Sequence, residues 1–444
     1  MKLNNFLNAN TWLFLELVII TIVAWAVFEP AIVNLYYRSL PLGYDNDQLL
    51  YAEAAMNGEC LSDADDNPKD PYDMTPYYMT EERRDQILRQ LMTVEGVESA
   101  YLFDQPYGSM GYSQAAFNNC CAGGDTLLLA NVTLTTDAHF FETYGLKPLP
   151  GSPSAEELSH IKTVDKQVVL TRSGAIALFG TEDDGEHLSS VVGRHFTICY
   201  DPAYEVTVAG VVEDFRMSVP TTIRSMIITT KELQTTNCQY VIRLKPGLNA
   251  SRFVEEHGRD LISSGKTGFN RISNLMTFDE YLQQLELDDG RTQEVNRSLA
   301  LALFFHINLM LAVIGTVWLH VKRRTEECGV RRAFGATRGR LLLDFLWRNA
   351  LLATAAVIIG CIIYLNYAHS GIQVYNGEEN YETLYTYQGY LLPIDKTWVD
   401  YFWHHFLIIS AVVYIIILCT VLIGTAIPAV KIIGAKITNA LKDE

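Results

Sequence analysis

Long apolar runs divide the chain into parts that can cross a membrane and parts that cannot. Residues 11–28, 299–321, 349–367 and 406–430 are 18 to 25 residues long, and Glu16 is their only charged residue. A helix needs about 20 apolar residues to cross the hydrocarbon core, so we expect four transmembrane helices rather than buried core helices. The first run has only Lys2 before it and no small-x-small site after it, which favours an uncleaved anchor over a signal peptide.

Between the first and second runs, helical and strand periodicities alternate over about 260 residues. This mixture predicts an α+β domain, in one or two lobes. We expect helices at 81–92 (capped by Thr80), 137–144 (ending at Gly145), 172–179 (closed by Gly180), 251–263 and 277–287. We expect strands at 98–103, 126–132, 167–171, 196–199, 204–214, 226–230 and 240–244.

These patterns predict a membrane protein with four transmembrane α-helices and a large α+β domain between the first and second. The expected divisions are residues 1–37 (first helix), 38–296 (α+β domain) and 297–444 (helices two to four). The acidic stretch 63–73 resembles a solvated loop, because its spacing fits no EF-hand calcium site.

The net charge of −17 combines two opposed regions. Residues 38–296 carry 20 basic and 39 acidic side chains, whereas the connection 322–348 carries eight basic and three acidic ones. With the two termini, the basic side holds 12 basic and five acidic residues. Basic loops stay in the cytoplasm, so we expect both termini there and the large domain outside. The acidic total excludes nucleic acid as a partner, since phosphate binding needs clustered Lys and Arg.

No catalytic constellation is present in the sequence. It contains no G-x-x-x-x-G-K-[ST] phosphate loop, no G-x-S-x-G elbow, no H-E-x-x-H and no C-x-x-C. We therefore expect no enzyme activity, no metal and no cofactor. Among the polar residues inside the runs, Glu16 is expected either to snorkel or to meet a partner helix, and His306 and Asn308 are expected to hydrogen-bond between helices. His404 and His405 are expected at a membrane boundary.

Five cysteines fall in the large domain, at positions 60, 120, 121, 199 and 238. An extracytoplasmic compartment permits disulfides, but the number is odd and the connectivity cannot be deduced from spacing. Cys328, Cys361 and Cys419 are expected to be unpaired.

The connection after the second run is more ordered than a solvated basic loop requires. It reads Arg323-Arg-Thr-Glu-Glu-Cys-Gly-Val-Arg-Arg-Ala-Phe-Gly-Ala-Thr337. Small residues let a short helix approach another protein closely, while Glu and Arg supply directional ion pairs. This pattern is typical of an element that docks on a partner.

Here the chain resembles the MacB, LolC/E and FtsX type of permease, whose members are partners of ABC ATPases. The residues that carry the resemblance, and that it assigns to ATPase coupling, are Arg324, Glu327, Gly329, Arg331, Arg332, Ala333, Gly335 and Ala336. Cys328 stands where the family usually has isoleucine. The resemblance extends along the chain. The tail 427–441 is similar to the family's end, and the segments 140–146 and 206–215 resemble the MacB-like periplasmic core domain. The segments 12–16 and 40–44 resemble those of Bacteroidetes members.

Two departures from the family are visible. The N-terminal entry helix is abbreviated, and the segment between the third and fourth runs, rich in tyrosine over 368–402, is longer than usual. We expect that segment either to form an extra element or to cover the base of the α+β domain.

The resemblance implies a non-catalytic permease subunit of an export or mechanotransmission complex in the bacterial inner membrane, with its large domain periplasmic. The implied partners are a separate ABC ATPase, a second copy or a paralogous permease, a periplasmic adaptor and the lipid membrane. The alternative is a membrane-anchored sensor whose periplasmic domain binds a ligand or a cell-wall hydrolase without transport. The absence of a signalling output domain in this sequence counts against the alternative.

Overall fold

The structure is a computed structural model that describes residues 3–56, 81–104, 116–135, 139–198, 204–219, 221–231, 238–264, 270–288, 290–323, 330–369 and 391–434. The chain forms two compact units. We call the first the membrane unit; it comprises the described parts of Met1–Tyr36, Thr292–Glu379 and Trp398–Glu444. The second, the α+β unit, comprises those of Tyr37–Arg291 and Asn380–Thr397.

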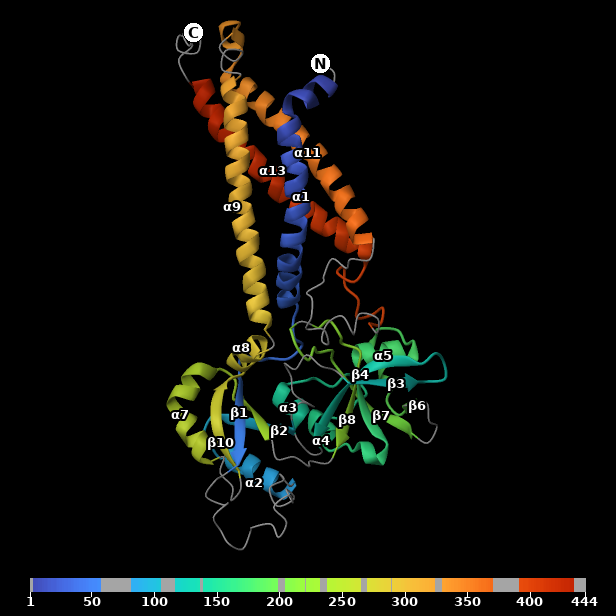
Figure 1. The fold of residues 1–444 in the computed structure, drawn as a ribbon. Coiled ribbons are helices and arrows are strands. Elements are labelled where there is room, and N and C mark those ends of the chain that lie inside the picture. Colours follow the sequence, from blue (N-terminus) through green and yellow to red (C-terminus); the bar gives the residue numbers. More distant parts are fainter. Residues whose placement is uncertain are drawn as a thin grey trace, which may run out of the picture. The chain divides into compact units, whose positions relative to one another are not determined.

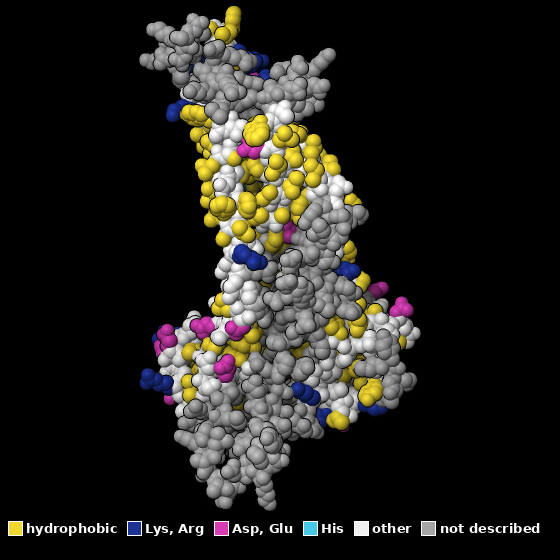
Figure 2. Space-filling model, in the orientation of Figure 1, with side chains coloured by type: hydrophobic (Ala, Val, Ile, Leu, Met, Phe, Trp, Pro, Cys, Tyr) yellow, Lys and Arg dark blue, Asp and Glu magenta, His cyan; other side chains and the backbone are white. Residues whose placement is uncertain are grey.

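Four long helices form the membrane unit (Figure 1): α1 (Leu3–Ser39), α9 (Arg291–Arg323), α11 (Arg338–His369) and α13 (Phe402–Gly434). Each is long and apolar enough to cross a membrane and contains one of the expected spans. The expected fold class, four transmembrane helices with an α+β domain between the first and second, is therefore confirmed. Hydrophobic side chains predominate among the coloured side chains on this unit's visible surface, whereas carboxylates are more frequent on the α+β unit (Figure 2).

Small residues permit close helix packing inside the membrane unit. A Cβ added at Gly360 of α11 would lie 2.7 Å from the Cβ of Thr21 on α1. Transmembrane helices commonly use small residues for such approaches. Trp25 is buried at the same interface and stacks on Tyr364, with ring centroids 4.3 Å apart.

One lobe of the α+β unit is an antiparallel sheet in the order β10-β1-β9-β2. Its strands are β1 (Leu49–Met56), β2 (Val97–Asp104), β9 (Cys238–Leu244) and β10 (Asn270–Thr277). Apolar side chains of α2 (Glu81–Met92) and α7 (Ala250–Ser264), among them Ile87, Leu91 and Leu261, pack with one face of the sheet. The sheet therefore has a core of its own.

The other lobe is a closed six-stranded barrel in the order β3-β4-β8-β5-β7-β6. Its strands are β3 (Ala116–Cys121), β4 (Leu127–Thr135), β5 (Gln167–Thr171), β6 (His195–Ile198), β7 (Glu205–Val212) and β8 (Met226–Lys231). Pairs β4–β8 and β5–β7 are parallel. Its short helices are α3 (Phe140–Tyr144), α4 (Ala155–Ser159), η3 (Thr163–Asp165), α5 (Arg172–Phe179) and α6 (Gly185–Ser189).

An aromatic cluster joins the two lobes. Tyr51 of the sheet stacks on Tyr281 of α8 (Phe278–Asp288) with centroids 3.6 Å apart, and both belong to a core that includes barrel residues such as Ile228. Thr277 and Glu280 form a reciprocal capping box that starts α8. The lobes therefore share one continuous core.

Most of the expected elements are confirmed, including β5 and α5 with their expected limits. Gly145 and Gly180 end α3 and α5 with φ of 65° and 60°, as their positions predicted. The prediction for 137–144 was too long, because His139 is left-handed and α3 begins at Phe140. Strands β1, β3 and β10 were not predicted. Thr80, residues 63–73 and most of the tyrosine-rich segment lie outside the described residues.

Candidate functional site

The basic connection between α9 and α11 ends in a tight turn over residues 330–337, which we call the basic turn. Residues 330–333 are helical, and the turn closes with Gly335 N–H donating to the Arg332 carbonyl and Ala336 N–H to the Arg331 carbonyl, both at 3.0 Å. Gly335 has φ of 94°, a conformation that residues with a Cβ avoid. Thr337 then starts α11, since Leu341 N–H donates to its carbonyl.

Arginines of the basic turn contact two transmembrane helices. Arg332 Nη1 donates to the Ile433 carbonyl, 2.8 Å away in the last turn of α13. Arg331 Nη1 lies 3.1 Å from Asp344 Oδ2 on α11, and Arg348 Nε lies 3.0 Å from the other oxygen of that carboxylate. The exposed ion pairs add little stability. Together, however, these contacts fix the turn's orientation relative to α11 and α13.

The outward surface of the basic turn is apolar at its centre. Phe334 is 88% exposed, and Val330, Ala333 and Gly335 beside it are also exposed. Ala336 instead packs against the core of the membrane unit. The arrangement thus presents one aromatic side chain among small residues and fixed arginines.

Of the eight residues expected to couple an ATPase, Arg331, Arg332, Ala333, Gly335 and Ala336 lie in the basic turn. Arg324, Glu327 and Gly329 lie outside the described residues. The sequence reasoning did not select Phe334, Asp344 or the Ile433 carbonyl. No sequence pattern signals the exposure of Phe334, because an apolar residue at one position is as compatible with a buried as with an exposed side chain.

Residues 299–436, which include the basic turn, match the FtsX-like permease C-terminal family. The chain is also 29% identical over 234 residues to the macrolide export ATP-binding/permease protein MacB of Chromobacterium violaceum. The membrane part of the chain therefore contains an FtsX-like permease domain, and the chain is similar to ABC permeases of the MacB type. The match covers 50% of this chain, which spans about a third (33%) of the length of that relative.

Two solved structures resemble parts of this chain. The periplasmic region of MacB from Actinobacillus actinomycetemcomitans is 14% identical, with a TM-score of 0.30, over 55% of this chain and 94% of that one. A domain of a putative permease protein from Porphyromonas gingivalis is 10% identical, with a TM-score of 0.31, over 53% and 92% respectively.

Inside the membrane unit, a carboxylate of α1 meets an imidazole of α13. Glu29 is fully buried, and its Oε1 lies 3.0 Å from Nε2 of His405, without hydrogen-bond alignment. The other ring nitrogen, Nδ1, lies 3.0 Å from the Val399 carbonyl and donates to it. The ring is stacked with Trp25 and lies edge-on to Trp398. The pair therefore links two spans where a lone charge would be costly.

Other polar residues of the spans differ in how far they match expectation. Glu16 does meet a neighbouring helix, since Thr316 Oγ1 of α9 donates to its carboxylate at 3.1 Å. Asn308 was expected to bond between helices, but its amide donates to the Phe304 carbonyl of the same helix at 2.7 Å. His306 packs edge-on against Phe28 of α1. A bond between helices comes instead from Asn349, which donates to Thr425 at 3.1 Å.

In the α+β unit, a buried arginine holds the chain that emerges from α1. Arg216 is 3% exposed and donates to the carbonyls of Pro41 at 2.9 Å and of Leu40. It also donates to the carbonyls of Val219 and Thr221, at 2.8 and 3.2 Å. Arginine can saturate several acceptors at once because its fork carries five N–H groups. The loop between β7 and β8 is thereby fixed to residues 40–41.

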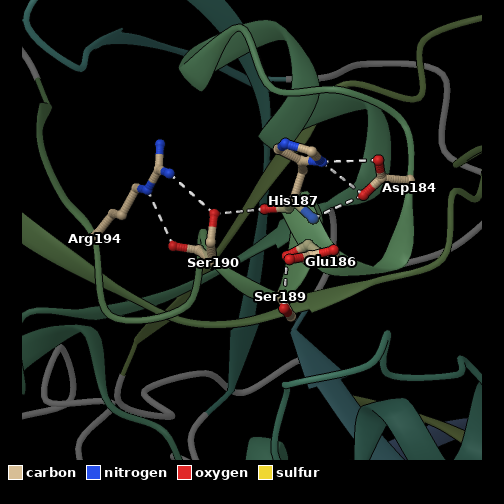
Figure 3. Close-up of polar contacts among 6 residues, drawn as sticks. All are labelled: Asp184, Glu186, His187, Ser189, Ser190 and Arg194. Atoms are coloured by element: carbon tan, nitrogen blue, oxygen red, sulfur yellow. Dashed lines mark hydrogen bonds and ion pairs between the residues drawn. The ribbon is translucent and has the colours of Figure 1, made fainter.

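An exposed group of three possible metal ligands lies at the start of α6, and Figure 3 shows two of them, Asp184 and His187. Ligand atoms of Glu182, Asp184 and His187 lie within 4.8 Å of one another. Asp184 caps α6, accepting from His187 N–H and lying 2.8 Å from its ring Nδ1. The His187 hydrogen bonds lower the pKa of Asp184, and that carboxylate raises the pKa of His187. Capping explains this geometry, and we assign no metal to it.

Cysteine pairing can be followed at only some positions. Cys121, Cys361 and Cys419 are free thiols, and Cys120 beside Cys121 on β3 is buried. Cys361 and Cys419 are unpaired as expected, whereas Cys60, Cys199 and Cys328 lie outside the described residues.

Proposed function

We propose that this chain is the non-catalytic permease subunit of a complex in which a separate ABC ATPase docks on the basic turn. The observation that carries the proposal is the 88% exposure of Phe334 beside arginines already fixed to α11 and α13. Aromatic side chains ringed by polar groups are the usual anchors of protein interfaces. A push on Phe334 would therefore reach two spans directly.

Nucleotide chemistry is assigned to the partner because this sequence contains no phosphate loop. The curated relative is named as both ATP-binding and permease, and this chain spans a third of it. ATP-driven closure of the partner would move the basic turn. The membrane helices would carry that movement toward the α+β unit, whose helix α8 is followed by α9 after only two residues.

The expected setting is a bacterial inner membrane with both termini cytoplasmic and the α+β unit periplasmic. A second copy or a paralogous permease completes the pair of subunits, and a periplasmic adaptor is a further partner in the export version of the proposal. Export, mechanotransmission and hydrolase activation would all use the same ATP-driven movement of the basic turn. The alternative, a ligand or hydrolase sensor without transport, would need no ATPase on the basic turn.

Co-purification tests the docking site. Tagged wild-type chain is expected to retain an ABC ATPase subunit through detergent purification, with ATP hydrolysis in the eluate. Phe334→Asp, and separately Glu327→Lys combined with Arg331→Glu, should remove that subunit, because each disrupts the apolar anchor or the ion pairs. Val164→Asp is the matched control, since Val164 is 83% exposed but belongs to the α+β unit.

Two outcomes would contradict the proposal. Normal amounts of ATPase with both basic-turn variants would refute docking at this turn. A wild-type chain that binds a periplasmic ligand or hydrolase but never an ATPase would favour the sensor.

A further inference from the structure

The segment that leads into α13 is part of the α+β unit before it reaches the membrane unit. Leu391 packs against the core shared by the two lobes, and the neighbouring Leu392 packs against the separate core inside the barrel lobe. Residues 391–395, which we call the strap, therefore attach to two hydrophobic clusters.

A buried carboxylate fixes the end of the strap. Asp395 is 1% exposed, and its Oδ1 accepts from the N–H groups of Arg224 at 2.8 Å and Ser225 at 3.1 Å. Its Oδ2 accepts from the Ser225 hydroxyl. The Arg224 side chain donates to the Ile394 carbonyl at 2.5 Å. A carboxylate with this many donors is a specific attachment, since burial without them would be costly.

The attachment point is the start of a central barrel strand. Ser225 immediately precedes β8, which pairs with β4 on one side and β5 on the other. Thr171 of β5 reinforces the junction, because its hydroxyl donates to the Arg224 carbonyl at 2.5 Å and accepts from Met226 N–H at 2.8 Å. A displacement of Asp395 would therefore act on β8 and β5.

Almost no slack separates the strap from the membrane unit. Trp398 packs against the core of the membrane unit, and Val399, also buried, accepts a hydrogen bond from His405 of α13. Only Lys396 and Thr397 lie between Asp395, fixed in one unit, and Trp398, fixed in the other. Two fully extended residues span at most about 7 Å. This linker therefore cannot absorb a large displacement of α13.

We propose that the strap is a route by which movement of α13 reaches the barrel lobe, with Asp395 as its positioning residue. The loop between β7 and β8 then receives both chain segments, since Arg216 holds residues 40–41 after α1 and Arg224–Ser225 hold the strap before α13. This inference rests on the proposed function, because a partner ATPase must supply the movement. The inference adds the barrel lobe to the parts that move.

The test adds slack while leaving the Asp395 contacts in place. A Gly-Gly-Ser-Gly insertion between Lys396 and Thr397 is made in the full chain, with its ATPase, in nanodiscs. Hydrogen exchange of β8 and β5 is compared with and without ATP plus vanadate. The control is the same insertion between Gly123 and Gly124. A Cβ added at either glycine would have no neighbouring atom within 4 Å, so the chain is open to insertion there.

In the wild type and the control, exchange in β8 and β5 is expected to change with nucleotide. The strap insertion should abolish that change yet keep the basal protection of the Arg224 and Ser225 amides. Asp395→Ala should raise exchange of those two amides at least about tenfold, because each loses a hydrogen bond to a charged group. Asp395→Asn, which keeps an acceptor oxygen, should retain most of the protection and the nucleotide response.

A strap insertion with a wild-type nucleotide response in β8 would overturn the strap proposal alone. A wild-type chain that binds no ATPase would overturn the proposed function and, with it, the strap. If the strap only covers the barrel, the insertion should leave the nucleotide-dependent exchange of β8 and β5 unchanged. The insertion therefore distinguishes transmission of movement from a covering role.

Discussion

At the scale of single residues, buried carboxylates set much of the behaviour of the α+β unit. Asp214 follows β7 and accepts from the backbone N–H of Ser173 at 2.7 Å and from its hydroxyl at 2.5 Å, at the start of α5. Burial raises the pKa of Asp214, although the Ser173 hydrogen bonds and the nearby Arg224 and Arg172 act in the opposite direction. Burial likewise raises the pKa of Asp395.

The raised pKa of Asp214 predicts a pH dependence of stability with a definite sign. The folded state keeps the proton to higher pH than the unfolded state, so stability falls as pH rises from 3.8 toward the raised value. One such group contributes a slope of at most about 1.4 kcal/mol per pH unit. In thermal unfolding, the stability of the wild type relative to full-length Asp214→Asn should therefore fall as pH rises through this window.

Asp184 supplies a control of opposite sign. Its pKa is lowered, so its contribution is present above 3.8 and lost as pH falls through the lowered value. The stability of wild type relative to Asp184→Asn should therefore rise with pH, whereas that relative to Asp214→Asn should fall. Equal slopes for the two variants would contradict these assignments.

Some residue-scale features were predictable and others were not. Gly145 and Gly180 signalled their helix ends because only a residue without a Cβ adopts positive φ easily. Asp395 gave no such signal, since its partners Arg224 and Ser225 lie 170 residues or more away in sequence. Long-range contacts of this kind depend on the tertiary fold and leave no local pattern.

At the scale of elements, apolar length and periodicity predicted all four long helices and most strands of the α+β unit. Of the missed strands, β3 and β10 carry mixed patterns, whereas β1 reads Leu-Leu-Tyr-Ala-Glu-Ala-Ala-Met and is mostly apolar. β10 reads Asn-Arg-Ile-Ser-Asn-Leu-Met-Thr and lies at a sheet edge, and its register against β1 shifts between Glu53 and Ala54. An edge strand needs apolar residues on one face only, and a bulge interrupts the alternation that would reveal it.

The contact between α1 and α13 supports an element-scale prediction. Removing one partner of the Glu29–His405 pair leaves a buried polar group unpaired, so Glu29→Ala or His405→Ala should each lower the free energy of unfolding by about 2 kcal/mol or more. The double change Glu29→Ala with His405→Ala should cost less than the sum of the two single changes, because the second change leaves no further buried group unpaired. Thermal unfolding in detergent would measure the coupling.

Thr316→Val is the control for this pair. It removes the half-buried Glu16–Thr316 bond between α1 and α9, and such bonds average well under about 1 kcal/mol in membranes. Strict additivity of the Glu29 and His405 changes would show that the two side chains do not interact.

At the scale of the whole molecule, the sequence predicted the fold class and the permease type more completely than the site. Residues 331–336 could be assigned to the basic turn from their pattern, but Phe334 was overlooked because hydrophobicity at one position does not reveal exposure. The sequence predicts that the segment 368–402 either forms an extra element or covers the base of the α+β domain, but no local pattern distinguishes residues 391–395 as the part that attaches.

The opposed charges of the two regions lead to a prediction about orientation. Short connections near helix ends determine orientation, and residues 322–348 hold eight basic residues against three acidic ones. The basic turn should therefore be cytoplasmic and the α+β unit on the opposite side.

In a chain whose eight cysteines are replaced, Val164→Cys should react with a membrane-impermeant maleimide on intact spheroplasts, and Phe334→Cys only after detergent lysis. The two side chains are 83% and 88% exposed, so steric access is matched and the difference reports the side of the membrane. Labelling of Phe334→Cys on intact spheroplasts would place the basic turn outside, where no ATP-driven partner could reach it, and would overturn both the orientation and the docking proposal.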